Sequence, residues 1–313
     1  MTAVLFGRPS RPAMDDRFEL EAEALEELGV EAHAIALDPV VLGDAERALE
    51  VLPRPRGRDW LYRGWMLRED EYAALEEALA ERGESLVVDA ERYALATYAP
   101  AWTPLLGAHT APARWTDEPD VREAWELAQE LGPPPWIVKD HVKSAKEDWL
   151  RACWVPPGAD FDAFASVCAA LLDLRGDAFE RGFLIKKQLP LARLPGFLSE
   201  GRPATDEHRL FFWRGELVAH APYWDADGAL AAPEEFAWLG DAIDSPFFVA
   251  DVAPLEGGGA TVLEINDGGT AWLPERLDPR ELYAAIFRRA LRTRDRDGRP
   301  SRGSGRASRR RRR

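Results

Sequence analysis

Two apolar segments in the last quarter of the chain constrain its fold most strongly. Residues 247–253 and 260–265 have the composition of β-strands, and the glycine-rich stretch PLEGGG connects them. Glycine leaves such a connection conformationally free. We therefore expect two neighbouring strands, with Asp251 on the first and Glu264 and Asn266 on the second.

The polar residues of these strands fit a metal site. Side chains two residues apart in a strand share a face, so Glu264 and Asn266 point the same way and Asp251 can lie opposite them. Two carboxylates and an amide oxygen are hard ligands suited to magnesium, which keeps several waters and binds phosphate oxygens. The alternative is that all three are ordinary polar strand and turn residues. This alternative explains Glu264 poorly, because the residues on either side of it look buried.

The N-terminal third alternates between strand and helix patterns, which predicts an open, largely parallel sheet with covering helices. The expected strands are 4–6, 34–37, 60–62 and 85–88, and the expected helices are 18–28, 69–82 and 91–98.

The rest of the chain mixes helices with antiparallel strand signals. A helix that ends at Gly132 precedes the strand WIVKD, and a helix at 161–174 precedes a strand at 182–189. Strands at 209–213 and 217–221 flank the turn Arg214-Gly215. Helices are expected at 234–243 and, beginning with Pro279, at 279–291. The predicted class is α/β, with an α+β C-terminal part.

The charge is unevenly distributed. The chain carries a net charge of −15, yet residues 292–313 hold eleven arginines and two aspartates, which leaves −24 for residues 1–291. This arginine-rich tail has too few apolar residues to form a core, so we expect it to be disordered. It could contact nucleic acid or another polyanion. Alternatively, it is a low-complexity extension that folds back on the acidic body.

Other broad classes find little support. No apolar run approaches the length of a membrane span, and no signal-peptide pattern opens the sequence, so we expect a cytoplasmic protein without a membrane partner. Cys153 and Cys168 belong to no metal-binding pattern and are interpreted as inert thiols. No GxSxG, HExxH or P-loop string is present.

The motifs WIVKDHVKSAKEDW, FLIKKQLPL, EHRLFFWRGELVAHAPYW and the final Asp…Glu-x-Asn set occur in an order that resembles the ATP-grasp superfamily. With YRGWML and the NDGG ending, the chain looks most like the clade named for two arginines and a lysine. The resemblance implies an ATP-grasp domain at 110–291, divided into a small subdomain at about 117–190 and a C-terminal subdomain at about 191–291. It implies a pre-ATP-grasp domain at 1–109, followed by the tail at 292–313.

On the phosphate side, the resemblance implies that Lys139 contacts the nucleotide phosphates, although a strand-end lysine in solvent is the plain alternative. The loop after it is usually glycine-rich in the family, whereas here Lys143 and Lys146 occupy it. They either replace backbone contacts with phosphate or form a solvated charge run.

On the adenine side, the resemblance places Lys186, Lys187, Gln188 and Leu189 at the hinge strand. The two lysines alternate faces, so only one can point inward. The plain alternative is a half-exposed strand.

Two arginines complete the implied site. Glu207 and Arg209 are two residues apart and can face it together, where the arginine would contact the γ-phosphate or an acyl phosphate. A surface ion pair is the alternative. Arg63 is expected at a strand end facing the cleft, with packing beside Trp65 as the alternative.

The implied cofactors are ATP and magnesium, and the implied activity is that of an ADP-forming carboxylate–amine ligase acting through an acyl phosphate. Its substrates would be a small-molecule or peptide carboxylate and an amine acceptor. A polyanion-binding accessory protein and a phosphotransferase on the same scaffold are the alternatives.

Overall fold

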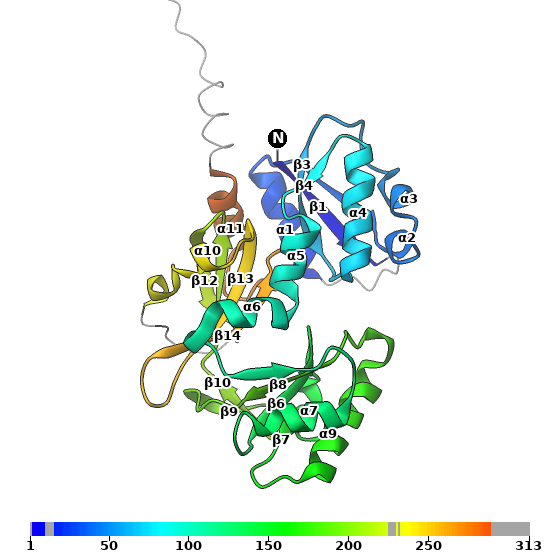
Figure 1. Cartoon of the computed structure of the whole chain (residues 1–313). Coiled ribbons are helices and arrows are strands. Elements are labelled where there is room, and N and C mark those ends of the chain that lie inside the picture. The colour runs from blue at the N-terminus through cyan, green and yellow to red at the C-terminus, as the bar shows by residue number, and fades with distance from the viewer. Residues whose placement is uncertain (1, 10–15, 225–229, 231, 289–313) are drawn as a thin grey trace, which may run out of the picture.

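The computed structural model describes residues 2–9, 16–224, 230 and 232–288. Figure 1 shows an N-terminal α/β unit, a C-terminal sheet beside it, and a small sheet with its helices at the opposite end of the molecule. Within these residues, no helix is both long and apolar enough to cross a lipid bilayer.

The N-terminal unit is an all-parallel sheet in the order β2-β1-β3-β4, as the alternation of patterns predicts. Its central strand β1 is buried along nearly its whole length, which suits a strand covered by helices on both faces. The strands are β1 (Thr2–Arg8), β2 (Ala32–Ala36), β3 (Asp59–Gly64) and β4 (Ser85–Leu86), and the helices are α1 (Asp16–Glu27), α2 (Asp38–Val41), α3 (Ala45–Leu49), α4 (Glu69–Glu81) and α5 (Ala90–Thr97).

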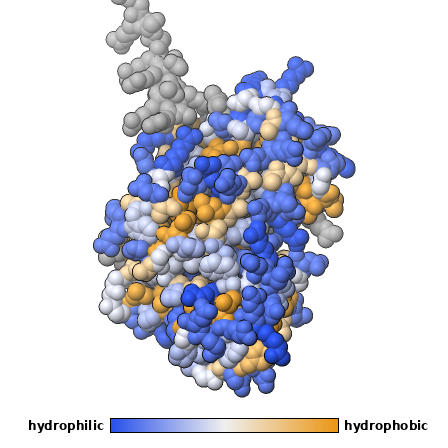
Figure 2. Space-filling model, in the orientation of Figure 1, coloured by the Kyte–Doolittle hydropathy of each residue, from blue (hydrophilic) through white to orange (hydrophobic). Residues whose placement is uncertain are grey.

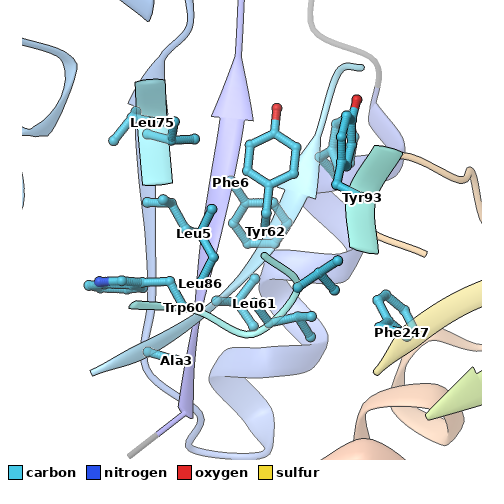
Figure 3. Close-up of a cluster of buried hydrophobic side chains, with 14 of the residues drawn as sticks. Ala3, Leu5, Phe6, Trp60, Leu61, Tyr62, Leu75, Leu86, Tyr93 and Phe247 are labelled. Atoms are coloured by element: carbon cyan, nitrogen blue, oxygen red, sulfur yellow. The ribbon is translucent and has the colours of Figure 1, made fainter. Parts of the chain in front are cut away.

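Figure 3 shows the centre of this unit, where Leu5, Phe6 and Tyr62 lie among side chains from neighbouring elements. Phe247, from the C-terminal sheet, belongs to the same buried cluster. The N-terminal unit and one face of the C-terminal sheet therefore share a continuous core, which holds the two together.

The small sheet has the order β5-β8-β6-β7 and is antiparallel. Helices α7 and α9 pack on it around their own core. The side chains of Asp120 and Asp160 accept hydrogen bonds from backbone N–H groups in the first turns of these helices, which fixes where each begins. The elements are β5 (Ala113–Trp115), α7 (Val121–Gln129), β6 (Trp136–Asp140), α8 (Trp149–Ala152), β7 (Trp154–Val155), α9 (Phe161–Arg175) and β8 (Phe183–Lys187).

The C-terminal sheet, in the order β12-β11-β13-β14, is also antiparallel. One face packs on the N-terminal unit, and the other on a second cluster that includes α6 and the 3-10 helix Pro233–Phe236. The separate hairpin β9–β10 precedes it. The elements are α6 (Ala99–Leu106), β9 (Arg193–Ser199), β10 (Arg202–Thr205), β11 (His208–Trp213), β12 (Glu216–Pro222), α10 (Leu239–Ala242), β13 (Phe247–Pro254), β14 (Ala260–Asp267) and α11 (Pro279–Ile286).

The two hairpins expected in the C-terminal part are present. Arg214 and Gly215 both have positive φ, of 51° and 82°, which matches the tight turn between β11 and β12. The helix expected at 234–243 is instead a 3-10 helix followed by the short α10. Gly240 packs so closely on Gly215 that a Cβ would lie 1.9 Å from its carbonyl oxygen, so tertiary packing dictates this segment.

Two other helix predictions need adjustment. The backbone of Tyr98 is extended, so α5 ends there and a second helix, α6, begins with a proline in its first turn. The closing helix is α11, which ends at Ile286; residues 289–291 of its expected range and the whole tail lie outside the described residues.

Candidate functional site

A cavity of about 410 Å³ lies between the small sheet and the C-terminal sheet. Its size falls within the range of small-molecule sites. It is lined by α6, β6, the loop after β6, residues 186–191, the β9–β10 hairpin and strands β13 and β14.

One wall of the cavity carries a row of charged residues on adjacent strands. In the antiparallel register Arg209 pairs with Asp251, and Asp251 pairs with Glu264. Directly opposed residues place their side chains side by side on one face. Asn266, two residues beyond Glu264, pairs with Val249 on that face. The predicted metal ligands therefore lie together.

A β-bulge adjusts the register beside these residues. After the Asp251–Glu264 pair, Val252 pairs with Val262, so Leu263 is the additional residue on β14. Its backbone carbonyl accepts a hydrogen bond of 2.7 Å from Lys186 Nζ. The bulge thus turns a backbone carbonyl toward the cavity lysine.

Arg209 and Asp251 form a two-pronged ion pair. Arg209 Nε and Nη2 each donate a hydrogen bond of 2.8 Å to Asp251, and Nη1 donates one of 2.7 Å to the Trp272 carbonyl. Burial opposes the charge, but Asp251 outweighs it and raises the pKa of Arg209. Its donors are engaged within the protein, so contact with the γ-phosphate stays a prediction.

Lys139 and Lys146 converge on Glu264. Lys139, at the end of β6, forms a short ion pair with Glu264 Oε1, and Lys146 Nζ lies 3.7 Å from Oε2. Burial by itself would raise the pKa of Glu264, yet the lysines hold it well below its usual value. Glu264 in turn is the main reason that the pKa of Lys146 is raised. Three cations and two carboxylates therefore meet on this wall.

The two loop lysines differ in position. Lys146 lines the cavity, whereas Lys143 is exposed and is not among the lining residues. The side chain of Asp140 accepts hydrogen bonds from the backbone N–H groups of Val142 and Lys143, which fixes the start of the loop. The sequence alone gives no reason to prefer either lysine.

At the hinge, the structure separates the two adjacent lysines. Lys186 Nζ bonds to the bulge carbonyl and lies 5.4 Å from the centre of the Trp102 ring. Lys187 Nζ instead reaches the Pro133 carbonyl in an exposed place. Gln188 and Leu189 line the cavity, and Gln188 Oε1 accepts a hydrogen bond from the indole of Trp154. Lys186 is thus the inward-facing lysine.

Glu207 lines the cavity and shares the sheet face of Arg209. Its Oε1 accepts a hydrogen bond of 2.5 Å from the Thr205 hydroxyl and lies 3.7 Å from Arg202 Nη2.

Arg63 lies elsewhere. It is 1% exposed and is not among the cavity-lining residues. It pairs with Glu21 and donates hydrogen bonds to the backbone carbonyls of Gly268, Gly269 and Ala271. It does not face the cleft as expected, because its guanidinium connects the end of β3 to the loop after β14.

Sequence reasoning missed Arg202 and Trp149, which both line the cavity. Arg202 begins β10, in a hairpin that was not expected. Gly201, which has a φ of 73° in the turn between β9 and β10, is the signal that could have revealed it.

The donor set fits magnesium. Within the described ranges, no group of three or more histidine, cysteine, aspartate or glutamate residues is arranged to hold a metal. Asp251, Glu264 and Asn266 instead offer two carboxylates and an amide oxygen on one face. Magnesium is commonly held by one or two carboxylates together with water and phosphate oxygens.

Comparison with known structures gives matches over nearly the whole chain. A RimK domain protein ATP-grasp from Sphaerobacter thermophilus is 18% identical, with a TM-score of 0.56, and the match covers 92% of this chain and 99% of that one. D-cycloserine synthetase DcsG is 14% identical, with a TM-score of 0.60 and coverages of 92% and 99%. The ATP-grasp ligase PsnB, in complex with a minimal precursor, Mg and ADP, is 14% identical, with a TM-score of 0.54 and coverages of 94% and 98%. At these identities the matches establish the fold.

No curated protein sequence matches the chain. The model of the ATP-grasp domain of family 3 in the clade named for two arginines and a lysine matches residues 130–286, which is half of the chain and includes most of the residues that line the cavity. The chain therefore belongs to the ATP-grasp superfamily, in family 3 of that two-arginine, one-lysine clade.

Proposed function

We propose that this chain is an ATP-dependent carboxylate–amine ligase that forms ADP and works through an acyl phosphate. The observation that carries the proposal is the row of Arg209, Asp251 and Glu264 on the cavity wall, with Lys139 against Glu264. Cations and metal-ligating oxygens on one wall are what a magnesium-bound triphosphate requires.

The chemistry proceeds in two steps. A carboxylate oxygen of the substrate attacks the γ-phosphorus of ATP, and ADP leaves. The amine nitrogen then attacks the acyl carbon, phosphate leaves, and the nitrogen loses a proton. Magnesium, when bound, would neutralise phosphate charge and align the reacting oxygens.

The residues of this chain divide the work. Asp251, Glu264 and Asn266 would hold the metal, and Arg209 keeps the Asp251 carboxylate in place through its two hydrogen bonds. Lys139 and Lys146 would turn from Glu264 to the phosphates. No protein nucleophile is needed.

The other end of the cavity suits a flat apolar group. Trp102, Ile137, Leu189, Val262 and Leu263 contribute to its lining. These walls would hold the adenine ring, with Lys186 beside it.

Solved structures of similar fold provide context for this proposal. The PsnB structure holds a peptide-type precursor, Mg and ADP, and that of N5-carboxyaminoimidazole synthase from Aspergillus clavatus holds ADP and a ribonucleotide. We infer that ATP and magnesium act here too, on a small-molecule or peptide carboxylate. The cytoplasmic location stays a prediction.

The test measures nucleotide binding and turnover by the purified protein. We expect magnesium-dependent ATP binding by calorimetry and ADP release that requires both a carboxylate and an amine from a panel of amino acids and peptides. The double variant Glu264→Ala/Asn266→Ala should bind ATP at least tenfold more weakly, because phosphate charge loses its metal. Glu216→Ala, an exposed carboxylate on β12, is the matched control.

Two results would reject the proposal. The first is unchanged magnesium-dependent nucleotide affinity in the double variant. The second is an intact phosphorylated product that no amine consumes, which would instead indicate the phosphotransferase alternative.

A further inference from the structure

Two arginines lie near the phosphate-binding wall, and they differ in how much of their hydrogen-bonding capacity the protein uses. Arg209 donates from Nε, Nη1 and Nη2 to Asp251 and to the Trp272 carbonyl. A guanidinium has five N–H donors, and three well-formed hydrogen bonds to fixed partners leave it little freedom to turn. Arg209 is therefore suited to holding Asp251.

Arg202 is engaged far more loosely. Its side chain is only 12% exposed, and its guanidinium carbon lies 5.9 Å and 5.3 Å from the ring centres of Trp149 and Trp224. Its ion-pair partner, Glu207, is 3.7 Å away, which is beyond hydrogen-bond distance, and already accepts a hydrogen bond from Thr205. Arg202 lines the cavity, so its donors are available to a ligand there.

The surroundings of Arg202 favour an anion. Lys146 lies within electrostatic range of Arg202, Glu207 and Glu264. Arg202, Lys146 and Lys139 line the same cavity, and Lys146 connects the position of Arg202 to the predicted metal ligand Glu264. An anion that reaches from Glu264 toward the β9–β10 hairpin would thus meet Lys139, then Lys146, then Arg202.

The shape of the group narrows the choice of anion. A planar guanidinium donates two parallel hydrogen bonds to the oxygens of a phosphoryl group, and contact with indole rings helps to orient it. The ligand group that carries several oxygens at the far end of a nucleotide is its terminal phosphate.

We propose that Arg202 is the arginine that contacts the terminal phosphate of bound ATP, and that Arg209 is a positioning residue that orients Asp251. This assignment rests on the proposed function, because it requires nucleotide in the cavity. It moves the phosphate-contacting role from the Glu-x-Arg arginine to the hairpin before it.

The test compares two nucleotides that differ in the terminal phosphate. Affinities for ADP and for a non-hydrolysable ATP analogue are measured by calorimetry with magnesium for the wild type, Arg202→Gln, Arg202→Lys and Arg209→Gln. We expect Arg202→Gln to weaken binding of the ATP analogue about tenfold more than binding of ADP. Arg202→Lys should recover part of this difference, because it restores the charge without the fork.

Arg209→Gln should weaken binding of both nucleotides to a similar extent, because its effect passes through Asp251 and the metal. Arg151→Gln is the control, since Arg151 is an exposed neighbour on α8 that pairs with Asp148. Circular dichroism and thermal unfolding establish that each variant is folded, and Arg202→Lys carries the test if Arg202→Gln is not.

Three results would overturn the assignment. Arg202→Gln could weaken ADP and the analogue equally, it could change neither, or Arg209→Gln could carry the selective loss instead. A wild type that binds neither nucleotide would reject the proposed function itself, and this outcome is separate from the failure of the Arg202 variants.

Discussion

Lys186 combines a positive charge with an environment that disfavours it. It lies between the two sheets that enclose the cavity, where it reaches the Leu263 carbonyl and the Trp102 ring. Burial, and then the nearby charge of Lys139, lower the pKa of Lys186 to about 7. The protonation state of this lysine therefore changes close to neutral pH.

This lowered pKa makes stability depend on pH. Above about pH 10.5 Lys186 is neutral in both the folded and unfolded states. As the pH falls toward 7, the unfolded chain gains the proton first, so the free energy of unfolding falls, by at most about 1.4 kcal/mol per pH unit for one proton. Below about 7 both states hold the proton and the loss becomes constant.

We therefore predict that Lys186→Met gains stability relative to the wild type as the pH falls from 10 to 7, and that the gain levels off below 7. Urea unfolding at several pH values measures it. Lys187→Met is the matched control, because this lysine bonds to the Pro133 carbonyl in an exposed place. A difference between Lys186→Met and the wild type that does not vary with pH would contradict the prediction.

Residue-level predictions from the sequence succeed where strand periodicity determines the outcome. The two-residue spacing of Glu264 and Asn266, with Asp251 across the hairpin, is enough to bring the three side chains together. Periodicity cannot show which cation pairs with which carboxylate. The engagement of Arg209 by Asp251, and the difference between Lys143 and Lys146, depend on contacts between segments far apart in the sequence.

At the level of elements, Arg63 connects the N-terminal sheet to the loop after β14. Its guanidinium pairs with Glu21 of α1, whose carboxylate also accepts a hydrogen bond from the Tyr283 hydroxyl of α11. The same guanidinium donates to three carbonyls in residues 268–271. A buried charge with this many partners is costly to remove from one side only.

We predict that Arg63→Ala lowers the free energy of unfolding by about 3–5 kcal/mol, because it leaves the Glu21 carboxylate buried without its cation. Chemical denaturation measures the loss. Arg63→Met/Glu21→Leu, which removes both charges, should lose much less. If the Arg63→Ala protein keeps its stability but loses catalytic activity, Arg63 acts in catalysis, as the sequence resemblance implied.

The elements that sequence patterns missed are short and lack periodicity. β5 has three residues, β7 has two, and the β9–β10 hairpin contains Pro195, Gly196 and Pro203, which disrupt any alternation. Long apolar strands and helices with clear caps were recognised, because burial and capping leave a local signal. The hairpin that carries Arg202 depends instead on packing against the rest of the molecule.

Across the whole molecule, acidic residues predominate, yet cations gather at the cavity. Hydrophilic residues cover most of the face in Figure 2, and hydrophobic ones form separate patches. Residues 1–291 carry a net charge of −24, so the lysines and arginines at the cavity form a local exception. A locally positive site can attract an anionic nucleotide even when the net charge opposes it. The domain boundaries at 109 and 291 stay a prediction.

The charge distribution separates two kinds of anion binding. Residues 292–313 carry +9. Without them, the remaining chain should repel an extended polyanion, whereas the nucleotide depends on the cavity. We predict that a chain ending at residue 291 keeps its affinity for the ATP analogue within about twofold and loses any salt-dependent binding to duplex DNA.

Calorimetry with the nucleotide and fluorescence anisotropy with a labelled duplex, at about 50 and 200 mM salt, measure the two activities on the same preparations. Replacing the tail arginines with serine keeps the length and removes the charge, which distinguishes an electrostatic contribution from a steric one. If the shortened chain still binds DNA, the cations at the cavity reach a polyanion directly. If it loses the nucleotide, the tail contributes to the site, because the charge of residues 1–291 would then outweigh the local cations.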